Sequence, residues 1–312
     1  MSPEKPVGTK KSGTNFLYRD RYLYLMLLFP VLYFLIFKYL PMYGVSIAFK
    51  EYNIFQGIFA SEWVGLANFK ELMTSSDFIL VLRNTFALNF LDLIAGFPAP
   101  IILALLLNEI RFPNYKKTVQ TLLYLPHFLS WVIIGGIVLQ VFSPSYGIIN
   151  TFFKSLGLIK ESIPFLTNGP HWITTYVLVG VWQNIGWGTI IYLAAISGIS
   201  PDLYEAAEID GAKRFRKIIS ITIPCISSTI IILLILSIGR IALISFERPY
   251  IIGNTLVREY ADVISTYVYR IGIQSSRFSI ATAVGLFQSV ISLIFLVMAN
   301  ALAKRFGHKG IF

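Results

Sequence analysis

Six long runs of mostly apolar residues constrain the fold of this 312-residue chain more than any other feature. A helix needs about 20 such residues to cross the hydrocarbon core of a bilayer. Backbone groups in lipid must bond within the protein, which favours helices for isolated runs of this length. Only 13% of the residues are charged, about half the proportion typical of soluble domains. We therefore predict an all-α integral membrane protein whose six transmembrane helices are Tyr22–Leu40, Thr85–Leu107, Val119–Phe142, His171–Gly198, Ile218–Phe246 and Ile280–Ala303.

The distribution of lysine and arginine predicts the orientation, because cytoplasmic segments of membrane proteins carry more of them. With the N-terminus inside, fifteen of the 26 lysines and arginines fall in cytoplasmic segments and eight in external ones. We therefore expect both termini in the cytoplasm. On this basis the chain divides into a basic tail (1–21), a transmembrane domain (22–303) and a second tail (304–312). The first helix should remain as an uncleaved anchor, because no apolar signal core precedes it.

The composition also argues against several classes of function. A net charge of +10 would suit nucleic acid, but the basic residues border apolar runs and accompany no binding module. The single cysteine, Cys225, excludes an internal disulfide, and the three histidines lie too far apart to predict a metal site. Residues Gly8–Thr14 resemble a phosphate-binding loop, but the lysine after the second glycine and a preceding strand are both missing. We expect no catalytic residue, metal or cofactor in this chain.

The segment 200–224, between the fourth and fifth runs, has the signals of two short helices. Ser200 suits the N-cap of a helix, and Pro201 suits its first position. Gly211 suits the left-handed residue that ends a helix. A basic run then begins at Lys213, where it would lie near anionic lipid headgroups. The pattern predicts a bent pair of helices at the cytoplasmic membrane face, although a loop that only sets the topology would have a similar charge.

The spacing within this segment resembles the EAA loop of permease subunits in bacterial ABC importers. The family pattern is Glu-Ala-Ala, three residues, Gly, nine residues and Ile-x-Leu-Pro; only Ile223 departs from it here. The resemblance implies a type I ABC importer permease fold, in which this loop docks as a coupling helix on a separate ATPase that binds ATP and Mg. The residues implied in coupling are Glu205, Ala206, Ala207, Glu208, Asp210, Gly211 and Pro224.

Shorter segments resemble the carbohydrate-importing branch of this family, namely Tyr39–Gly44, Trp63–Phe69 and Trp187–Ala195. They imply a saccharide cargo, such as an oligosaccharide, and a bacterial inner-membrane location. The implied partners are a second homologous permease subunit, two ATPase subunits and an extracytoplasmic solute-binding protein. A homodimer, or a permease for amino acids or phosphonates, is an alternative within the same class. An ion-coupled carrier would need several buried acids, whereas Asp92 is the only one deep in a predicted span.

Polar residues inside the predicted spans are candidates for contact with cargo, because they are costly in lipid. Sugars need aromatic faces and amide or hydroxyl partners, so Trp182, Gln183 and Asn184 are the first choice. For two of the candidates, Asp92 and Arg240, a salt bridge that joins two helices is an equal alternative. The full candidate set for the substrate path is Asn89, Asp92, Trp182, Gln183, Asn184, Tyr192, Arg240 and Gln288.

Overall fold

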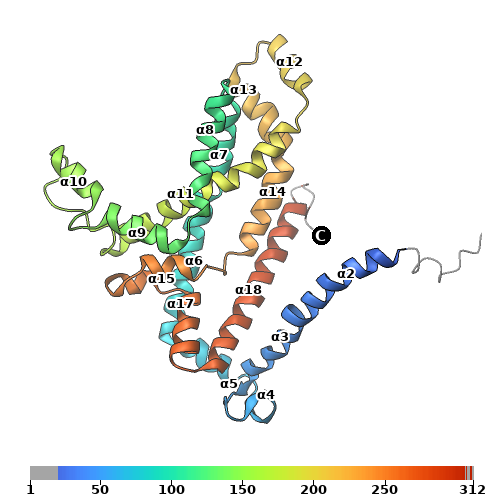
Figure 1. Cartoon of the computed structure of the whole chain (residues 1–312), viewed down its shortest axis with the longest axis vertical. Helices are drawn as coiled ribbons and strands as arrows, with labels where there is room; N and C mark the ends of the chain where they lie inside the picture. Colours follow the sequence, from blue (N-terminus) through green and yellow to red (C-terminus); the bar gives the residue numbers. More distant parts are fainter. Residues whose placement is uncertain (1–19, 306, 308–309, 311–312) are drawn as a thin grey trace, which may run out of the picture.

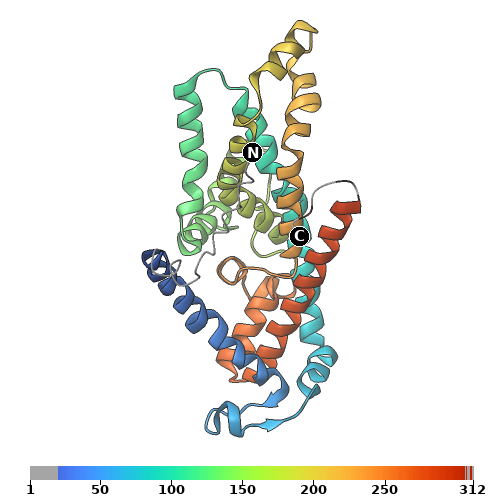
Figure 2. The same cartoon turned by 90° about the vertical axis from the view of Figure 1, so that its right-hand side faces the viewer.

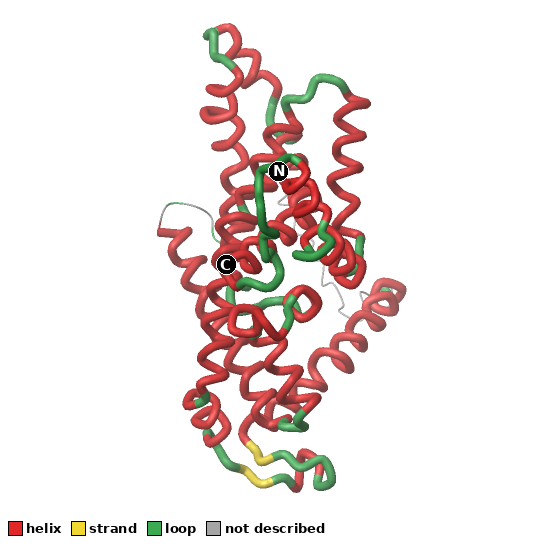
Figure 3. Tube along the Cα trace, turned by 90° about the vertical axis from the view of Figure 1, so that its left-hand side faces the viewer, coloured by secondary structure: helices red, strands yellow, loops and turns green. Residues whose placement is uncertain are grey.

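The computed structural model describes residues 20–305, 307 and 310, so residues 1–19 of the predicted N-terminal tail, with the Gly8–Thr14 motif, lie outside that range. The described part is mostly helical, as predicted (Figures 1 and 3). Within it, five helical stretches are long and apolar enough to cross a membrane. They are Arg21–Phe49, Ser76–Asn108, Gly169–Ser197, Arg214–Gly239 and Phe278–Arg305.

The third predicted span, Val119–Phe142, is not one straight helix. Helix α8 (Pro113–Tyr124) and the short helix η3 (Leu125–Phe128) meet α9 (Trp131–Phe142) at an angle of 105°. The apolar run does not mark this break, but local geometry explains it. Leu129 has an extended backbone, and the hydroxyl of Ser130 accepts a hydrogen bond from the backbone N–H of Ile133, which begins a new helix.

The fifth predicted span ends earlier than expected. The helix consists of α13 (Arg214–Lys217), the π-helical segment η4 (Ile218–Thr222) and α14 (Ile223–Gly239). The predicted end was Phe246, but residues 240–246 are not helical and lead into α15 (Glu247–Ile252). Side-chain amides from two neighbouring helices donate to the carbonyls of Ile241 and Ala242 in this unwound segment. These bonds replace part of the backbone hydrogen bonding that an apolar stretch loses when it leaves a helix.

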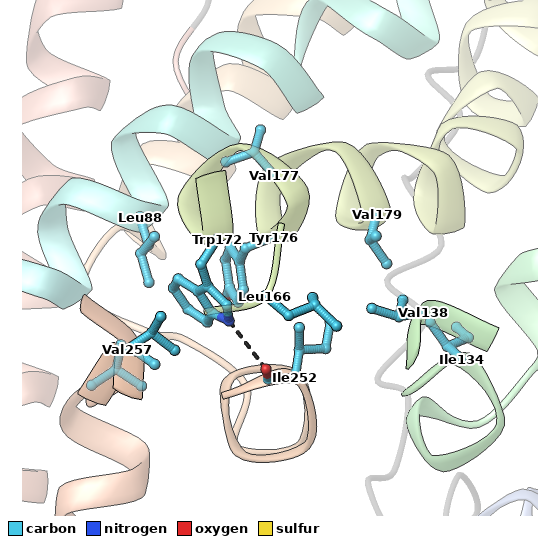
Figure 4. Packing of buried hydrophobic residues seen from close by; sticks show 12 residues of the cluster. Leu88, Ile134, Val138, Leu166, Trp172, Tyr176, Val177, Val179, Ile252 and Val257 are labelled. Atoms are coloured by element: carbon cyan, nitrogen blue, oxygen red, sulfur yellow. Dashed lines mark hydrogen bonds between the residues drawn. The ribbon is translucent and has the colours of Figure 1, made fainter. Parts of the chain in front are cut away.

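Helix α11 (Gly169–Ser197) lies at the centre of the fold, where it packs against α6 (Ser76–Gly96), α7 (Pro98–Asn108), α8 and α14. At one end of α11, Trp172 and Tyr176 pack with residues of α9 and α15 in the largest buried apolar cluster (Figure 4). The indole N–H of Trp172 donates to the carbonyl of Ile252 across 3.1 Å. This cluster fixes α15 against the central helix.

The segments between the spans form mostly short helices. They are α4 (Gly57–Ala60), α5 (Ala67–Thr74), α10 (Ile148–Ser155), α15, η5 (Thr255–Val257), α16 (Arg258–Ala261), α17 (Ile264–Val268) and η6 (Tyr269–Gln274). An antiparallel pair, β1 (Lys50–Glu51) and β2 (Glu62–Trp63), was not predicted (Figure 3). Within α5, the amide of Asn68 donates to the carbonyls of Ala48 and Lys50 and so ties the segment together.

The two ends of the molecule differ. Helix α12 (Pro201–Ile209) projects at one end, near the start of α8, and the β1–β2 pair lies at the opposite end (Figures 1 and 2). Arg214 and Glu109 approach to 3.9 Å and join the two loops at the α12 end. Helix α2 (Arg21–Phe34), by contrast, has no buried residue and diverges from the other long helices (Figure 1). Its apolar surface requires lipid or another chain as a neighbour.

Candidate functional site: a projecting helix and a membrane cavity

Helix α12 has well-formed ends. The Ser200 hydroxyl accepts a hydrogen bond from the N–H of Asp202 across 3.3 Å at its start. At its end, the N–H of Gly211 donates to Glu208 and that of Ala212 donates to Ala207, a Schellman motif. Gly211 has a φ of +75°, a conformation that costs a residue with a side chain about 1–2 kcal/mol. The glycine predicted to end the helix is therefore required by the backbone.

Two side-chain contacts attach α12 to the following long helix. The Tyr204 hydroxyl lies 2.9 Å from the hydroxyl of Thr222, which is buried in the π-helical segment η4. The ammonium group of Lys217 donates to the Glu208 carboxylate across 2.5 Å, and this hydrogen bond lowers the pKa of that exposed glutamate. Tyr204 and Thr222 were not among the predicted residues, although Thr222 lies within the Ile-x-Leu-Pro part of the motif. Both contacts allow α12 and α14 to move together.

Most of the remaining surface of α12 is exposed. The helix contains no buried residue, and Ile209 is 87% exposed. Exposed carboxylates and an exposed aliphatic side chain on a projecting helix form a surface that suits a groove on another protein. Of the residues implied in coupling, Glu205, Ala206, Glu208, Asp210, Gly211 and Pro224 are exposed, and Ala207 is half-buried.

A cavity of about 560 Å³ lies between α6, α7, α11 and α14. Its volume is within the range of roughly 300–1,000 Å³ that is usual for ligand sites. Five of the eight predicted path residues line it, together with Trp187 and Ser237. These five are Asn89, Asp92, Asn184, Tyr192 and Arg240.

Three predicted path residues lie outside this lining. Successive residues of a helix are separated by about 100°, so neighbours in sequence face different sides. On α11 the lining face contains Asn184, while the buried Gln183 accepts a hydrogen bond from the Asn184 amide and Trp182 lies on another face. The third, Gln288 on α18 (Phe278–Arg305), contacts backbone instead.

Asp92 forms a salt bridge, but its partner is Arg248 and not Arg240, the arginine named in the alternative to a path-lining role. Arg248 on α15 donates to both carboxylate oxygens of Asp92, at 2.7 and 3.1 Å. Arg248 also donates to the backbone carbonyl of Tyr176 and lies 3.5 Å from the centroid of the Tyr176 ring. A Cβ on Gly180 would overlap its guanidinium group. This buried cluster joins α6, α11 and α15, and sequence reasoning missed Arg248 because it lies in a predicted external segment.

Arg240, predicted from the sequence either as a path-lining residue or as the partner of Asp92, lies at the C-terminal end of α14 and lines the cavity. It forms no ion pair within the described part of the chain. The residues that follow it are held by two amides: Asn89 donates to the carbonyl of Ile241 at 2.7 Å, and Gln288 donates to that of Ala242 at 2.5 Å. The lining of the cavity therefore includes Asp92, which is paired with Arg248 outside it, and Arg240, which has no counter-ion among the described residues.

Comparison with known proteins agrees with this architecture. A family model described as the binding-protein-dependent transport system inner membrane component matches residues 81–308. Protein LplB of Bacillus subtilis is 47% identical, with 99% of this chain and 98% of the relative covered. The polygalacturonan/rhamnogalacturonan transport system permease protein YteP of B. subtilis is 48% identical, with 95% and 92% covered. A chain of a bacterial alginate ABC transporter, solved in complex with an alginate pentasaccharide-bound periplasmic protein, has a TM-score of 0.87 and 41% identity, with 95% and 99% covered.

Proposed function

The chain belongs to the family of binding-protein-dependent transport system inner membrane components, and on that basis we propose that it is a permease subunit of an ATP-driven importer of saccharides. A relative at 48% identity is named for polygalacturonan and rhamnogalacturonan transport, and the solved structure at 41% identity is an alginate transporter. These likenesses cover nearly the whole chain, and they favour a saccharide cargo over an amino acid or a phosphonate.

In this proposal the chain pairs with a second, homologous permease subunit, and the pair encloses the path for the saccharide. The exposed apolar surface of α2 supports a neighbouring chain. Two ATPase subunits bind ATP and Mg on the cytoplasmic side, and an extracytoplasmic protein delivers the cargo from the other side. The α12 end faces the cytoplasm of a bacterial cell, because the basic loops that precede α8 and α14 lie at that end.

The observation that carries the coupling role is the geometry of α12. Its outer surface is exposed, while Tyr204 and Lys217 connect its other side to the base of α14. When the ATPases close, a push on α12 would pass to α14, a helix that lines the cavity. Glu205 and its neighbours would contact the ATPase, and basic groups of the ATPase are their natural partners.

The test uses the complete transporter in proteoliposomes, with ATP hydrolysis and saccharide uptake measured in parallel. Glu205→Lys and Gly211→Pro should leave the chain inserted but abolish most of the uptake. Gly211→Ala should reduce uptake less, because its strain is only about 1–2 kcal/mol. Gly198→Ala is the matched control, since Gly198 has a negative φ and an added Cβ has ordinary contacts there. Normal stimulation of the ATPase and normal uptake in the Glu205 and Gly211 variants would refute the coupling role.

A further inference from the structure

The charges around the cavity do not balance within the described chain. Asp92 is the only acid among the residues that line it, and both of its carboxylate oxygens accept hydrogen bonds from Arg248. Arg240 also lines the cavity, is exposed to it and has no ion pair among the described residues. Because a guanidinium group does not lose its proton in proteins, the cavity has an uncompensated positive charge.

The backbone that follows Arg240 is held by neutral groups. Asn89 and Gln288 reach it from α6 and α18 and donate to the carbonyls of Ile241 and Ala242. These bonds replace the helical bonds lost where α14 ends at Gly239. They fix the start of the unwound segment and contribute no charge. The position of Arg240 is therefore defined while its positive charge is not neutralised.

The remaining lining groups suit a sugar. The indole of Trp187 and the ring of Tyr192 supply aromatic surface, and Asn184 supplies an amide. The Trp187 ring is stacked on His127, with ring centroids 4.7 Å apart and an angle of 4° between the ring planes. This contact orients the indole at the wall of the cavity. Aromatic rings and amides bind the apolar faces and hydroxyl groups of saccharides.

We propose that the cavity binds saccharides that carry carboxylate groups, such as oligomers of uronic acids, and that Arg240 is the residue that pairs with the carboxylate. This inference rests on the proposed function, because it names the cargo of the same path. An arginine and a carboxylate form strong, charge-assisted and often bidentate hydrogen bonds. A neutral saccharide would displace water from the guanidinium group without supplying a counter-charge, and a desolvated, unpaired charge is unfavourable.

Asn89 and Gln288 are positioning residues in this scheme. They act on the backbone beside Arg240, and the Gln288 side chain does not line the cavity. Gln288→Leu removes the donor to Ala242 and leaves the charge unchanged. It should therefore weaken carboxylate recognition less than the loss of Arg240 does.

The experiment compares uptake of trigalacturonate and of its neutral methyl ester by the complete transporter in proteoliposomes, with the solute-binding protein saturated by each. The wild-type transporter should prefer the acid. Arg240→Gln should reduce uptake of the acid about 10- to 100-fold, the range expected for a lost hydrogen bond to a charged group, and leave uptake of the ester nearly unchanged. Arg240→Lys should be intermediate, because lysine retains the charge but not the planar fork. Lys154→Gln, an equal charge change on α10, should have no effect.

Three results would overturn the inference. Equal uptake of acid and ester by the wild type, or an equal loss of both in Arg240→Gln, would exclude carboxylate recognition while saccharide import stood. Loss of the assembled complex in Arg240→Gln, with assembly retained in Arg240→Lys, would assign Arg240 to an acidic residue of the second subunit. A wild-type transporter that imported neither saccharide but imported an amino acid would refute the proposed function as well.

Discussion

Removal of the Asp92 carboxylate is the sharpest test of the buried cluster that joins α6, α11 and α15. Asp92→Asn keeps the shape of the side chain but leaves Arg248 without a counter-ion. Breaking a buried ion pair in this way costs about 3–5 kcal/mol. Two features place the expected cost near the lower limit: the Asp92 side chain is 25% exposed, and Arg248 keeps its contacts with the carbonyl and ring of Tyr176. We expect a loss of about 3 kcal/mol in the free energy of unfolding.

The measurement is the free energy of unfolding of this subunit in mixed micelles, titrated with dodecyl sulphate. The double variant Asp92→Leu with Arg248→Met should recover most of the loss, because a well-packed apolar pair can replace a buried ion pair at little cost. Asp77→Asn is the matched control. Asp77 pairs with Arg270 at 3.3 Å, but its side chain is 60% exposed, so this change should cost at most about 1 kcal/mol.

Two results would contradict this reasoning, one from the single variant and one from the double variant. If Asp92→Asn cost no more than Asp77→Asn, the pair would contribute little to stability. If the double variant lost the sum of the two single losses, the two side chains would act independently, and the salt bridge would not be the reason for their placement.

Two further variants test individual contacts. Tyr204→Phe removes the hydroxyl that bonds to Thr222. The free energy of unfolding should fall by about 1 kcal/mol, and the number of ATP molecules hydrolysed per saccharide imported should rise. An unchanged ratio would mean that the contact transmits no force. Gly180→Ala places a Cβ against the guanidinium of Arg248 and should destabilise the subunit by about 1–3 kcal/mol. The control is Gly136→Ala, where the space around the added atom is open. This control should be neutral or slightly stabilising in the same dodecyl sulphate titration.

The spans were predictable where apolar composition alone decides the structure. The fourth and sixth predicted runs, His171–Gly198 and Ile280–Ala303, agree within two residues at each end with α11 and α18. The third run was wrongly predicted as one straight helix, and the fifth was predicted to end too late. Both errors arise because hydropathy does not show where the backbone hydrogen bonding changes. The break at Leu129 depends on an extended residue and a serine cap, and the end of α14 depends on donors far away in the sequence.

The local structure of the α12 segment was predictable for a different reason. The residues that stabilise each end of α12 lie within one turn of that end, so the order of the sequence is enough to predict where the helix begins and ends. They are Ser200, Pro201 and Gly211. The partner of Asp92 was not predictable in this way. Arg240 and Arg248 are eight residues apart and both follow an apolar run. The choice between them depends on the unwound segment, which turns the chain so that Arg248 and Ile252 of α15 contact Tyr176 and Trp172 of α11.

The broken helix explains why two side-chain amides hold the carbonyls of Ile241 and Ala242, directly after Arg240. A free carbonyl in the membrane needs a donor, which a carboxylate in its ionised form does not have. A lysine or arginine could donate but would add a second positive charge to the same place. Only a neutral donor satisfies the carbonyls of Ile241 and Ala242 and leaves the charge at Arg240 as it is. Asn89 and Gln288 meet this condition, so a polar residue inside a membrane span can serve transport by bonding to backbone instead of to cargo.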